Sequence, residues 1–112
     1  MLVNFSNHPS SLWDAKQTEA AIAAYGEIKD IRFPKVDPKG DEAYIRHLAE
    51  HYFAEIMLQP DIKAVHIMGE QNLCFALIKM LMAKGIKCVA STTIRNEGDR
   101  PSFSFEQFRE YE

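Results

Sequence analysis

The chain has 112 residues, of which 46% are hydrophobic, so it can bury the core of one domain without a metal or a disulfide. Its formal net charge of −3 argues against a protein that coats long nucleic acid, because such binding needs many Lys and Arg contacts with phosphate. No apolar run approaches the about 20 residues that span a bilayer, and the first residues lack the basic start of a secretory signal, so we expect a cytoplasmic protein without a membrane partner.

Strand and helix patterns alternate along the chain, which is typical of βαβ units and a mainly parallel sheet. Residues 1–5 form the first predicted strand. A capping-box pattern at Ser11, with Asp14 three residues later, predicts the start of a helix that Gly26 closes. Residues 28–33 predict a second strand, whose interspersed charges suit the edge of a sheet.

Pro34 ends this strand, and a turn-rich segment leads to a helix that Asp41 caps and that stops before Pro60. Residues 62–68 are almost continuously apolar, as in a central strand covered on both faces. The next predicted helix, at about residues 72–84, is apolar nearly all round and must be covered on two sides. We expect a partner subunit in a homodimer to cover its second side, with a loop or the C-terminal segment as the alternative.

Two more strands complete the predicted sheet. Residues 86–90 form the fourth strand, and residues 95–102 form a hairpin loop. The aromatic residues of the fifth strand lose their alternation, which predicts a bulge or a strand end near residues 106–107. The predicted fold is a Rossmann-like, three-layer α/β sandwich in the order β-α-β-α-β-α-β-β, mainly parallel, with an antiparallel C-terminal edge strand. In this order the first strand lies beside the third.

A polar loop over residues 4–11 follows the first strand directly. Open α/β sheets bind ligands beyond the carboxyl ends of their strands, where the chain connections diverge, so this loop indicates a binding crevice. His8 is its clearest proton-transfer candidate because imidazole titrates near neutrality, although His8-Pro9 is equally readable as a turn element. The residues expected to orient a ligand or to move a proton are Ser6, Asn7 and His8. The neighbouring ligand-binding candidates are Ser10, Ser11 and Trp13.

Trp13 stands at the first turn of the predicted helix. Its ring could stack on a nucleobase, and packing within the protein is the alternative.

The third predicted strand ends at Gly69 and Glu70. A glycine lets a ligand approach the backbone closely, and the free N–H groups of the following helix favour an anion such as phosphate. The chain has neither a G-x-G-x-x-G motif nor a Walker-type Lys motif, and Glu70 adds negative charge at this corner. The alternative is that Glu70 complements the helix dipole.

The fourth predicted strand ends in a run of hydroxyl side chains, with an arginine two residues further on. The hydroxyls could bind phosphate or base edges, and the guanidinium could neutralise a phosphate. The alternative is a threonine-rich strand end with a solvated arginine. These ligand-binding candidates are Ser91, Thr92, Thr93 and Arg95.

The other histidines and the cysteines predict structure rather than chemistry. His66, inside an apolar strand, is expected to be a hydrogen-bonded core histidine. His47 and His51 have helical spacing but lack the Glu of an H-E-x-x-H motif, so we predict no metal site and no cofactor. Cys74 and Cys88 lie in apolar surroundings and are expected to be buried thiols.

Short motifs that span most of the chain resemble those of the small stand-alone CRISPR-associated proteins grouped with ring nucleases. The motifs are Asn4-Phe5-Ser6, His8-Pro9, Met68-Gly69-Glu70, Ser91-Thr92-Thr93 with Arg95, and the terminal Phe108-Arg109-Glu110-Tyr111.

This resemblance implies a Rossmann-like fold related to the CARF sensor domains, a dimer, and binding of the cyclic oligoadenylates that type III CRISPR complexes make. The implied activity is metal-independent cleavage of cyclic tetra-adenylate by in-line attack of a ribose 2′-hydroxyl, which switches off an antiviral signal. Positions at the predicted crevice assign Ser6, Asn7 and His8 to orientation or proton transfer, and they assign Thr92, Thr93 and Arg95 to phosphate. A sensor that binds the ring without cleaving it is the alternative, and a structural interaction protein is a third.

Overall fold

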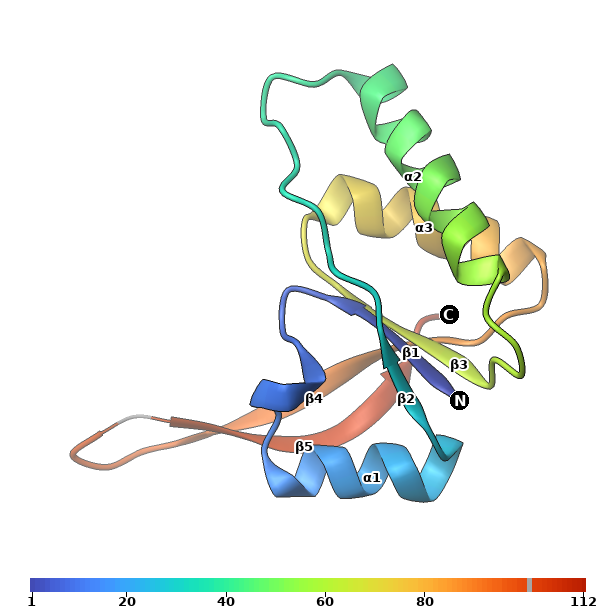
Figure 1. Ribbon diagram of the computed structural model, residues 1–112. Coiled ribbons are helices and arrows are strands. Elements are labelled where there is room, and N and C mark those ends of the chain that lie inside the picture. The colour runs from blue at the N-terminus through green and yellow to red at the C-terminus, as the bar shows by residue number, and fades with distance from the viewer. Residues whose placement is uncertain (101) are drawn as a thin grey trace.

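The structure, a computed structural model, describes residues 1–100 and 102–112. In these residues the chain forms a five-stranded sheet in the order β2-β1-β3-β4-β5 (Figure 1). The strands are β1 (Leu2–Ser6), β2 (Ile28–Asp30), β3 (Ala64–Met68), β4 (Cys88–Asn96) and β5 (Ser102–Glu110). All neighbouring pairs are parallel except β4 and β5, which are antiparallel. The predicted α/β class, with a mostly parallel sheet and an antiparallel C-terminal pair, is confirmed, and it is compatible with a Rossmann-like fold.

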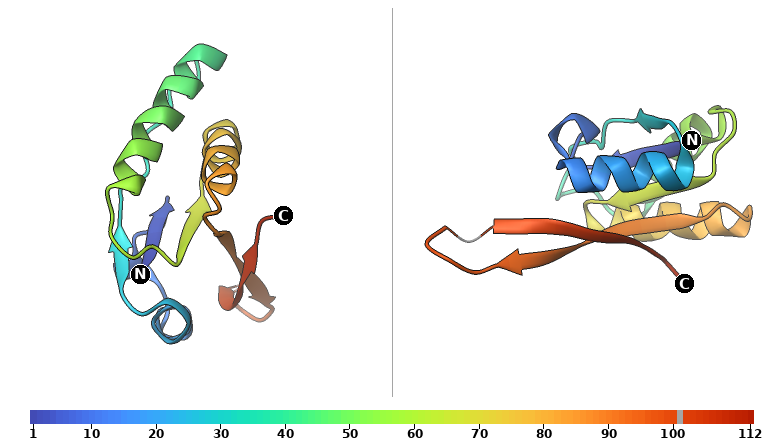
Figure 2. Two further views of the ribbon diagram at one scale, coloured as in Figure 1. Left: turned by 90° about the vertical axis from the view of Figure 1, so that its right-hand side faces the viewer. Right: turned by 90° about the horizontal axis from the view of Figure 1, so that it is seen from below.

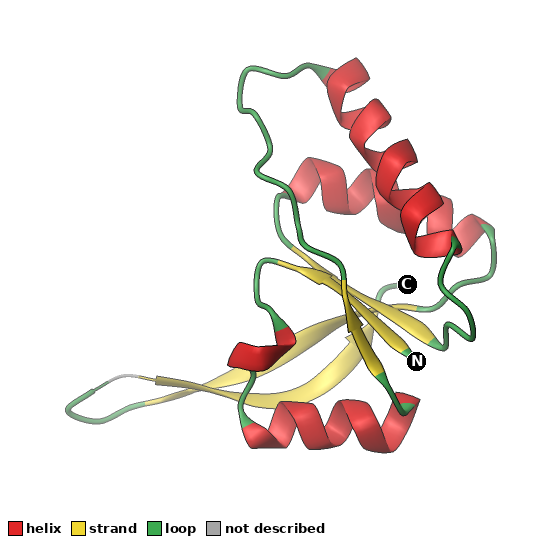
Figure 3. Ribbon diagram, viewed as in Figure 1, coloured by secondary structure: helices red, strands yellow, loops and turns green. Residues whose placement is uncertain are grey.

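Helices cover both faces of the sheet (Figures 2 and 3). α1 (Ala15–Tyr25) lies on one face, whereas α2 (Glu42–Met57) and α3 (Gln71–Ala83) lie together on the other. The connection after β1 therefore leaves toward one face, and the connection after β3 leaves toward the opposite face. Such a divergence between neighbouring strands is where open α/β sheets form a ligand crevice.

Two clusters of buried side chains join the layers. The larger cluster lies on the side of α2 and α3 and includes Phe5, Ile67 and Leu77. The smaller cluster lies on the side of α1 and includes Leu2 and Ala21. Because alternate strand residues point to opposite faces, a strand covered on both faces is apolar almost throughout. The prediction of a central strand over residues 62–68 is confirmed by β3, which lies between β1 and β4.

Local signals set most helix ends. Asp41 caps α2 as predicted, and its carboxylate accepts a hydrogen bond from a backbone N–H of the first turn. Gly26 ends α1 with a positive φ of 87°, a conformation that suits glycine. The predicted helix start at Ser11 is wrong, because Ser11 lies in the short 3₁₀ helix η1 (Ser10–Leu12).

Asp14 is the residue that starts α1. Its carboxylate accepts hydrogen bonds from the backbone N–H of Gln17 (2.8 Å) and of Phe105 in β5 (3.2 Å). These bonds hold the pKa of Asp14 below its usual range. Asp14 therefore caps the helix and also attaches it to the edge strand, a tertiary contact that local sequence does not reveal.

β4 is longer than its predicted span over residues 86–90. It continues to Asn96 and pairs with β5 over this whole extension, so the hairpin projects beyond the rest of the sheet (Figures 1 and 2). The hairpin loop predicted over residues 95–102 is therefore shorter than expected, because β4 takes up its first residues. Pro101, which was part of the predicted loop, lies outside the described residues. The bulge predicted near residues 106–107 is confirmed, since the register of β5 against β4 shifts between the partners of Thr92 and Thr93.

α3 is only partly covered on its second side. α2 packs along it, and Tyr111 from the C-terminal segment packs on the same cluster of apolar residues. Phe75 is still 65% exposed and Met82 is 41% exposed. Among the described residues, no helix combines the length and the hydropathy that are needed to cross a bilayer.

Candidate functional site

A cavity of about 370 Å³ opens at the carboxyl edge of the sheet, on the side of α1. Residues from β3, β4, β5, the loop after β1 and the start of α1 line it. They are His8, Trp13, Gln17, His66, Met68, Ser91, Thr93 and Phe103. We call it the histidine cavity. Four of the predicted site residues therefore come together at one place: His8, Trp13, Ser91 and Thr93.

Asn4 anchors the loop that brings His8 to this cavity. The Asn4 side chain is 2% exposed, and its Nδ2 donates to Asp30 Oδ1 and to the carbonyl oxygen of His8, both at 2.9 Å. Ser6 Oγ donates to Asn4 Oδ1 at 2.8 Å. Ser10 Oγ donates to Asp30 at 2.8 Å. Ser6 and Ser10 thus fasten the polar loop from within, and neither side chain lines the cavity.

His66 lies beneath the loop and lines the cavity. It is opposite Asn4 in the register of β1 and β3, and its Nδ1 is 2.8 Å from Asn4 Oδ1. The residue is 1% exposed, and burial, followed by the nearby charge of His8, lowers the pKa of His66 to about 4. The ring is therefore neutral near pH 7. The expected hydrogen bond of a core histidine is present, but a place in the cavity wall was not predicted.

Aromatic rings form one wall of the cavity. Trp13 Nε1 donates to the carbonyl oxygen of His8 (3.1 Å), which fixes the orientation of the indole. The Trp13 ring meets the His66 ring edge-on, with centroids 5.4 Å apart, and Phe108 meets His66 in the same way at 5.6 Å. Phe103, at the rim, is 68% exposed. Trp13 thus packs within the protein and still presents part of its surface to the cavity.

β4 sorts the predicted hydroxyls onto two faces. Ser91 and Thr93 line the cavity, and Ser91 Oγ donates to Met68 Sδ at 3.1 Å. Thr92, between them, exchanges hydrogen bonds of 3.2 Å with the backbone of Gln107, so its hydroxyl serves the hairpin.

Arg95 does not line the cavity, but it lies directly opposite Phe103 in the pairing of β4 and β5. Directly opposed residues of an antiparallel pair project from the same face of the sheet. Arg95 therefore shares the face of the hairpin on which Phe103 forms the cavity rim.

Protein groups fill the expected phosphate corner at the start of α3. The Glu70 carboxylate accepts hydrogen bonds from the backbone N–H groups of Asn72 (3.0 Å) and Leu73 (2.8 Å). A Cβ on Gly69 would clash with Cζ of Phe33, so the buried Phe33 ring occupies the space over this glycine. These contacts favour the alternative in which Glu70 serves the helix terminus.

Asn7 lines a second cavity, of about 480 Å³, that follows the end of β2. Its walls include the cations Arg32 and Lys35 together with Phe33 and Tyr52. We call it the basic cavity. Because Asn7 and His8 are consecutive, the loop after β1 contributes to both cavities. Ser11, in η1, is exposed and lines neither.

No group of three or more His, Cys, Asp or Glu side chains is placed to hold a metal ion in the part of the chain that the structure describes. Cys74 and Cys88 are buried free thiols, as predicted. Burial raises the pKa of each thiol to about 11, so both remain protonated and unreactive near neutral pH. His51 lies 3.8 Å from Glu55 on the exposed side of α2, which is a surface contact.

A family model matches residues 1–109, almost the entire chain. The chain belongs to the uncharacterized protein MJ1673 family. The comparison with curated proteins finds no match. The description of the MJ1673 family carries no activity.

Proposed function

We propose that this chain is a ring nuclease with a Rossmann-like, CARF-related fold that binds cyclic oligoadenylate and cleaves it without a metal ion. The observation that carries the proposal is the histidine cavity, which lies beyond the adjacent strands β1 and β3, where the chain connections diverge to opposite faces. Ligands of open α/β sheets bind at this position. The substrate follows from the resemblance of the motifs to those of ring nucleases, with cyclic tetra-adenylate as the preferred ring.

The groups around the cavity suit a nucleotide. Trp13 and Phe103 offer aromatic surface against which a base can stack, and stacking of this kind is worth about 1–3 kcal/mol per base. Ser91 and Thr93 offer hydroxyls to a base edge or to phosphate. Arg95, on the same face of the hairpin as Phe103, offers a cation at the rim.

The basic cavity supplies further positive charge for a ligand with several phosphates. Arg32 and Lys35 line it, and Asn7 joins it to the loop that carries His8. A ring of repeating nucleotides that crosses this loop would place one nucleotide in the histidine cavity and a neighbouring phosphate near the two cations. The corner at Glu70 takes no part, because its carboxylate already occupies the helix terminus.

The chemistry that these groups support is transfer within the substrate. The ribose 2′-oxygen attacks the neighbouring phosphorus, the bond from phosphorus to the 5′-oxygen breaks, and the products are a cyclic 2′,3′-phosphate and a 5′-hydroxyl. Orientation and stabilisation of the phosphate charge can supply most of the rate. His8 is the group that moves the proton, since its imidazole lines the cavity and is exposed to solvent. Ser6 acts as a positioning residue, because its hydroxyl holds the loop on which His8 stands.

A sensor that binds the ring and leaves it intact is the second candidate. The observation in its favour is that the cavity contains two histidines, of which His66 is a weak base because burial lowers its pKa to about 4. General acid or base chemistry in the cavity would then depend on His8 alone among its lining histidines.

Incubation of the purified protein with cyclic tetra-adenylate in EDTA, followed by chromatography of the products, separates the two candidates. Linear product ending in a cyclic 2′,3′-phosphate supports the nuclease. Retention of intact ring on the protein supports the sensor. If the protein neither binds nor cleaves the ring, both candidate functions are rejected.

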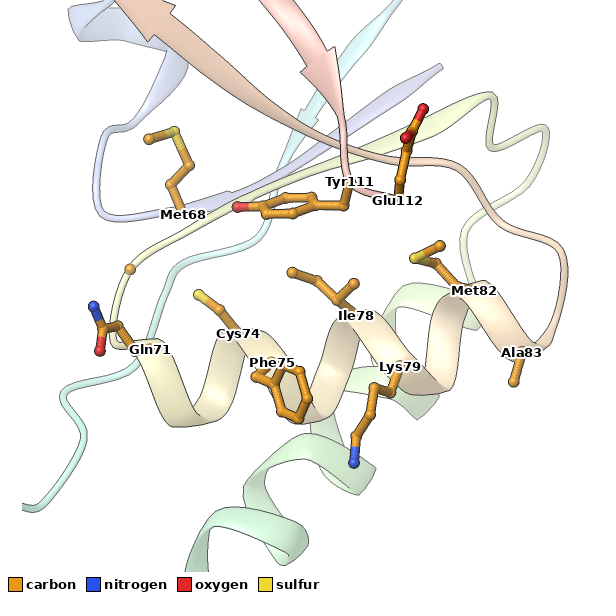
Figure 4. A pocket seen from close by; sticks show the side chains of 11 residues that line it. Met68, Gln71, Cys74, Phe75, Ile78, Lys79, Met82, Ala83, Tyr111 and Glu112 are labelled. Atoms are coloured by element: carbon orange, nitrogen blue, oxygen red, sulfur yellow. The ribbon is translucent and has the colours of Figure 1, made fainter.

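The proposed enzyme is a homodimer that forms through α3. A groove of about 710 Å³ runs along this helix, and Figure 4 shows Tyr111 lying over Cys74 and Ile78 on one side of it. Phe75 projects away from Tyr111 and is 65% exposed (Figure 4). Two-fold pairing through the exposed part of α3 would cover Phe75 and would give a repeating ring two equivalent sites.

A further inference from the structure

The hydrogen bonds of Asn4 determine which nitrogen of His66 carries a proton. Asn4 Nδ2 faces two acceptors, Asp30 Oδ1 and the carbonyl oxygen of His8, so the amide must point its nitrogen toward them. Asn4 Oδ1 therefore faces His66 Nδ1, at 2.8 Å. An amide oxygen only accepts hydrogen bonds, which requires a proton on Nδ1. In a neutral ring Nε2 is then unprotonated and presents a lone pair.

This lone pair is buried without a partner. In the described residues, Nε2 of His66 has no hydrogen-bond partner, although the residue is 1% exposed. Two donors that share the cavity are engaged elsewhere: Trp13 donates to the carbonyl oxygen of His8, and Ser91 donates to Met68 Sδ. Leaving a buried acceptor without a hydrogen bond destabilises the folded protein. A buried polar atom without a partner is typical of a site where a bound molecule supplies the missing hydrogen bond.

We infer that Nε2 of His66 accepts a hydrogen bond from an uncharged N–H or O–H group of the ligand in the histidine cavity. The cavity measures about 370 Å³, much more than the about 30 Å³ that one water occupies in the liquid. The aromatic walls at Trp13 and Phe103 suit a planar ring beside this acceptor. The inference rests on the proposed function only for the ligand, because the tautomer and the missing partner are properties of the protein alone.

Two groups of an adenine nucleotide have this chemistry: the 6-amino group of the base and the 2′-hydroxyl of the ribose. A 6-keto base, as in inosine, presents a carbonyl oxygen where adenine has its amino group. If the base amino group is the donor, a 6-keto base would place two acceptors against each other. His66 would in this way select adenine over hypoxanthine, a specificity that requires a buried acceptor which cannot turn to another partner.

The tautomer is tested first, on the ligand-free protein. NMR of ¹⁵N-labelled imidazole rings distinguishes a protonated nitrogen from a bare one. We expect His66 to show a proton on Nδ1 and a bare Nε2 at pH 7. A proton on Nε2, or a doubly protonated ring, would overturn the inference whatever the protein binds.

The donor is tested by titration with adenosine monophosphate, inosine monophosphate and 2′-deoxyadenosine monophosphate, with Trp13 fluorescence as an independent report of binding. We expect the Nε2 resonance to move with adenosine monophosphate. Weakening of about tenfold with the inosine compound assigns the base amino group, and the same weakening with the deoxy compound assigns the 2′-hydroxyl. Nucleotide binding that leaves the Nε2 resonance unmoved would overturn the inference.

The failure of the inference and the failure of the proposed function give different results. If none of these nucleotides and no cyclic tetra-adenylate changes Trp13 fluorescence, the proposed function fails. The inference then stands or falls on whether other planar amines, with aniline as the probe, move the Nε2 resonance.

The variant His66→Asn adds a test by substitution. The amide nitrogen of asparagine overlaps the position of Nδ1, so the bond to Asn4 can be kept while the Nε2 acceptor is lost. His51→Asn is the matched control, because the His51 side chain is 68% exposed and lies on α2, away from the cavity. We expect nucleotide binding to be at least fivefold weaker for His66→Asn and unchanged for the control. Equal affinity of the folded His66→Asn protein and the wild type would contradict the inference.

Discussion

Asn4 and His66 face each other on neighbouring buried strands, with Asn4 Oδ1 2.8 Å from His66 Nδ1. Through Asn4 this pair is also connected to Asp30 at the end of β2 and to the loop that carries His8. One buried amide therefore links the sheet, the loop and the cavity wall.

Replacing Asn4 should destabilise the fold. Asn4→Ala removes the partner of four buried or half-buried groups, so we expect a loss of roughly 2–4 kcal/mol in the free energy of unfolding. Urea unfolding at pH 7 measures it. Asn96→Ala is the matched control, since Asn96 makes exposed contacts on the hairpin and should cost less than about 0.5 kcal/mol. Equal effects of the two substitutions would mean that Asn4 is not a structural anchor.

The buried ring of His66 should make stability depend on pH. Its pKa is about 4 in the folded chain and 6.5 in its ordinary state, so the unfolded chain binds the extra proton between these values. The free energy of unfolding is therefore not reduced by His66 above pH 6.5. It falls as the pH drops from 6.5 toward 4, by roughly 3 kcal/mol at most. Urea unfolding across this range measures the loss.

The variant His66→Asn provides the comparison for that pH effect. Its unfolding free energy should fall less steeply between pH 6.5 and 4 than that of the wild type. Asp14 does not interfere with this test. Because the pKa of Asp14 is lowered in the folded chain, its contribution to the free energy of unfolding is lost only as the pH falls below 3.8. Parallel curves for the two proteins would show that His66 is not buried as a neutral ring.

Gly69 should resist even the smallest side chain. Gly69→Ala places a Cβ in steric conflict with the ring of Phe33, and we expect a loss of about 1–3 kcal/mol in the free energy of unfolding. The double variant Gly69→Ala with Phe33→Leu should cost less than the sum of the two single changes. Gly98→Ala is the control, because nothing lies within 4 Å of the added Cβ. Strict additivity, measured by thermal unfolding, would argue against the contact.

His8 and Arg95 should separate chemistry from binding. His8→Ala is expected to slow single-turnover cleavage of cyclic tetra-adenylate by about 10²–10⁴-fold with little change in Kd. Arg95→Ala should instead weaken binding, with a smaller effect at high salt, because the guanidinium contributes charge at an exposed rim. Arg46→Ala, on α2, is the charge-matched control for Arg95. A wild-type cleavage rate for His8→Ala would remove this residue from the chemistry.

The exposed part of α3 should hold the dimer together. Phe75→Glu puts a charge at the centre of the proposed interface, and we expect it to shift the protein to monomers in sedimentation experiments. Leu58→Glu is the control, because Leu58 is 81% exposed at the end of α2 and outside this groove. A wild-type protein that sediments as a monomer would reject the proposed dimer.

The sequence predicted the parts of the fold that local chemistry specifies. The cap at Asp41, the stop at Gly26 and the central position of β3 all follow from short patterns, and each is confirmed. The true end of β4 was missed, because the hydroxyls of residues 91–93 look like a loop until β5 pairs with them.

The site was likewise predicted only where local sequence specifies it. His8 and Trp13 were found because they follow a strand end, where binding loops are expected. The place of His66 in the cavity depends on its register opposite Asn4, which is a tertiary fact. The available signal was that each is a polar residue inside an otherwise apolar strand, which is costly unless the two satisfy each other.

Trp13 is the single tryptophan of the chain and lines the histidine cavity, so its fluorescence reports directly on the central claim. The decisive measurement is a titration of the protein with cyclic tetra-adenylate in EDTA, followed at this one residue. We predict a saturable change in emission that His66→Asn and Arg95→Ala each shift to a higher concentration of the ring. Emission that stays constant at saturating ring, or a change that survives unaltered in His66→Asn and Arg95→Ala together, would contradict a nucleotide site in this cavity.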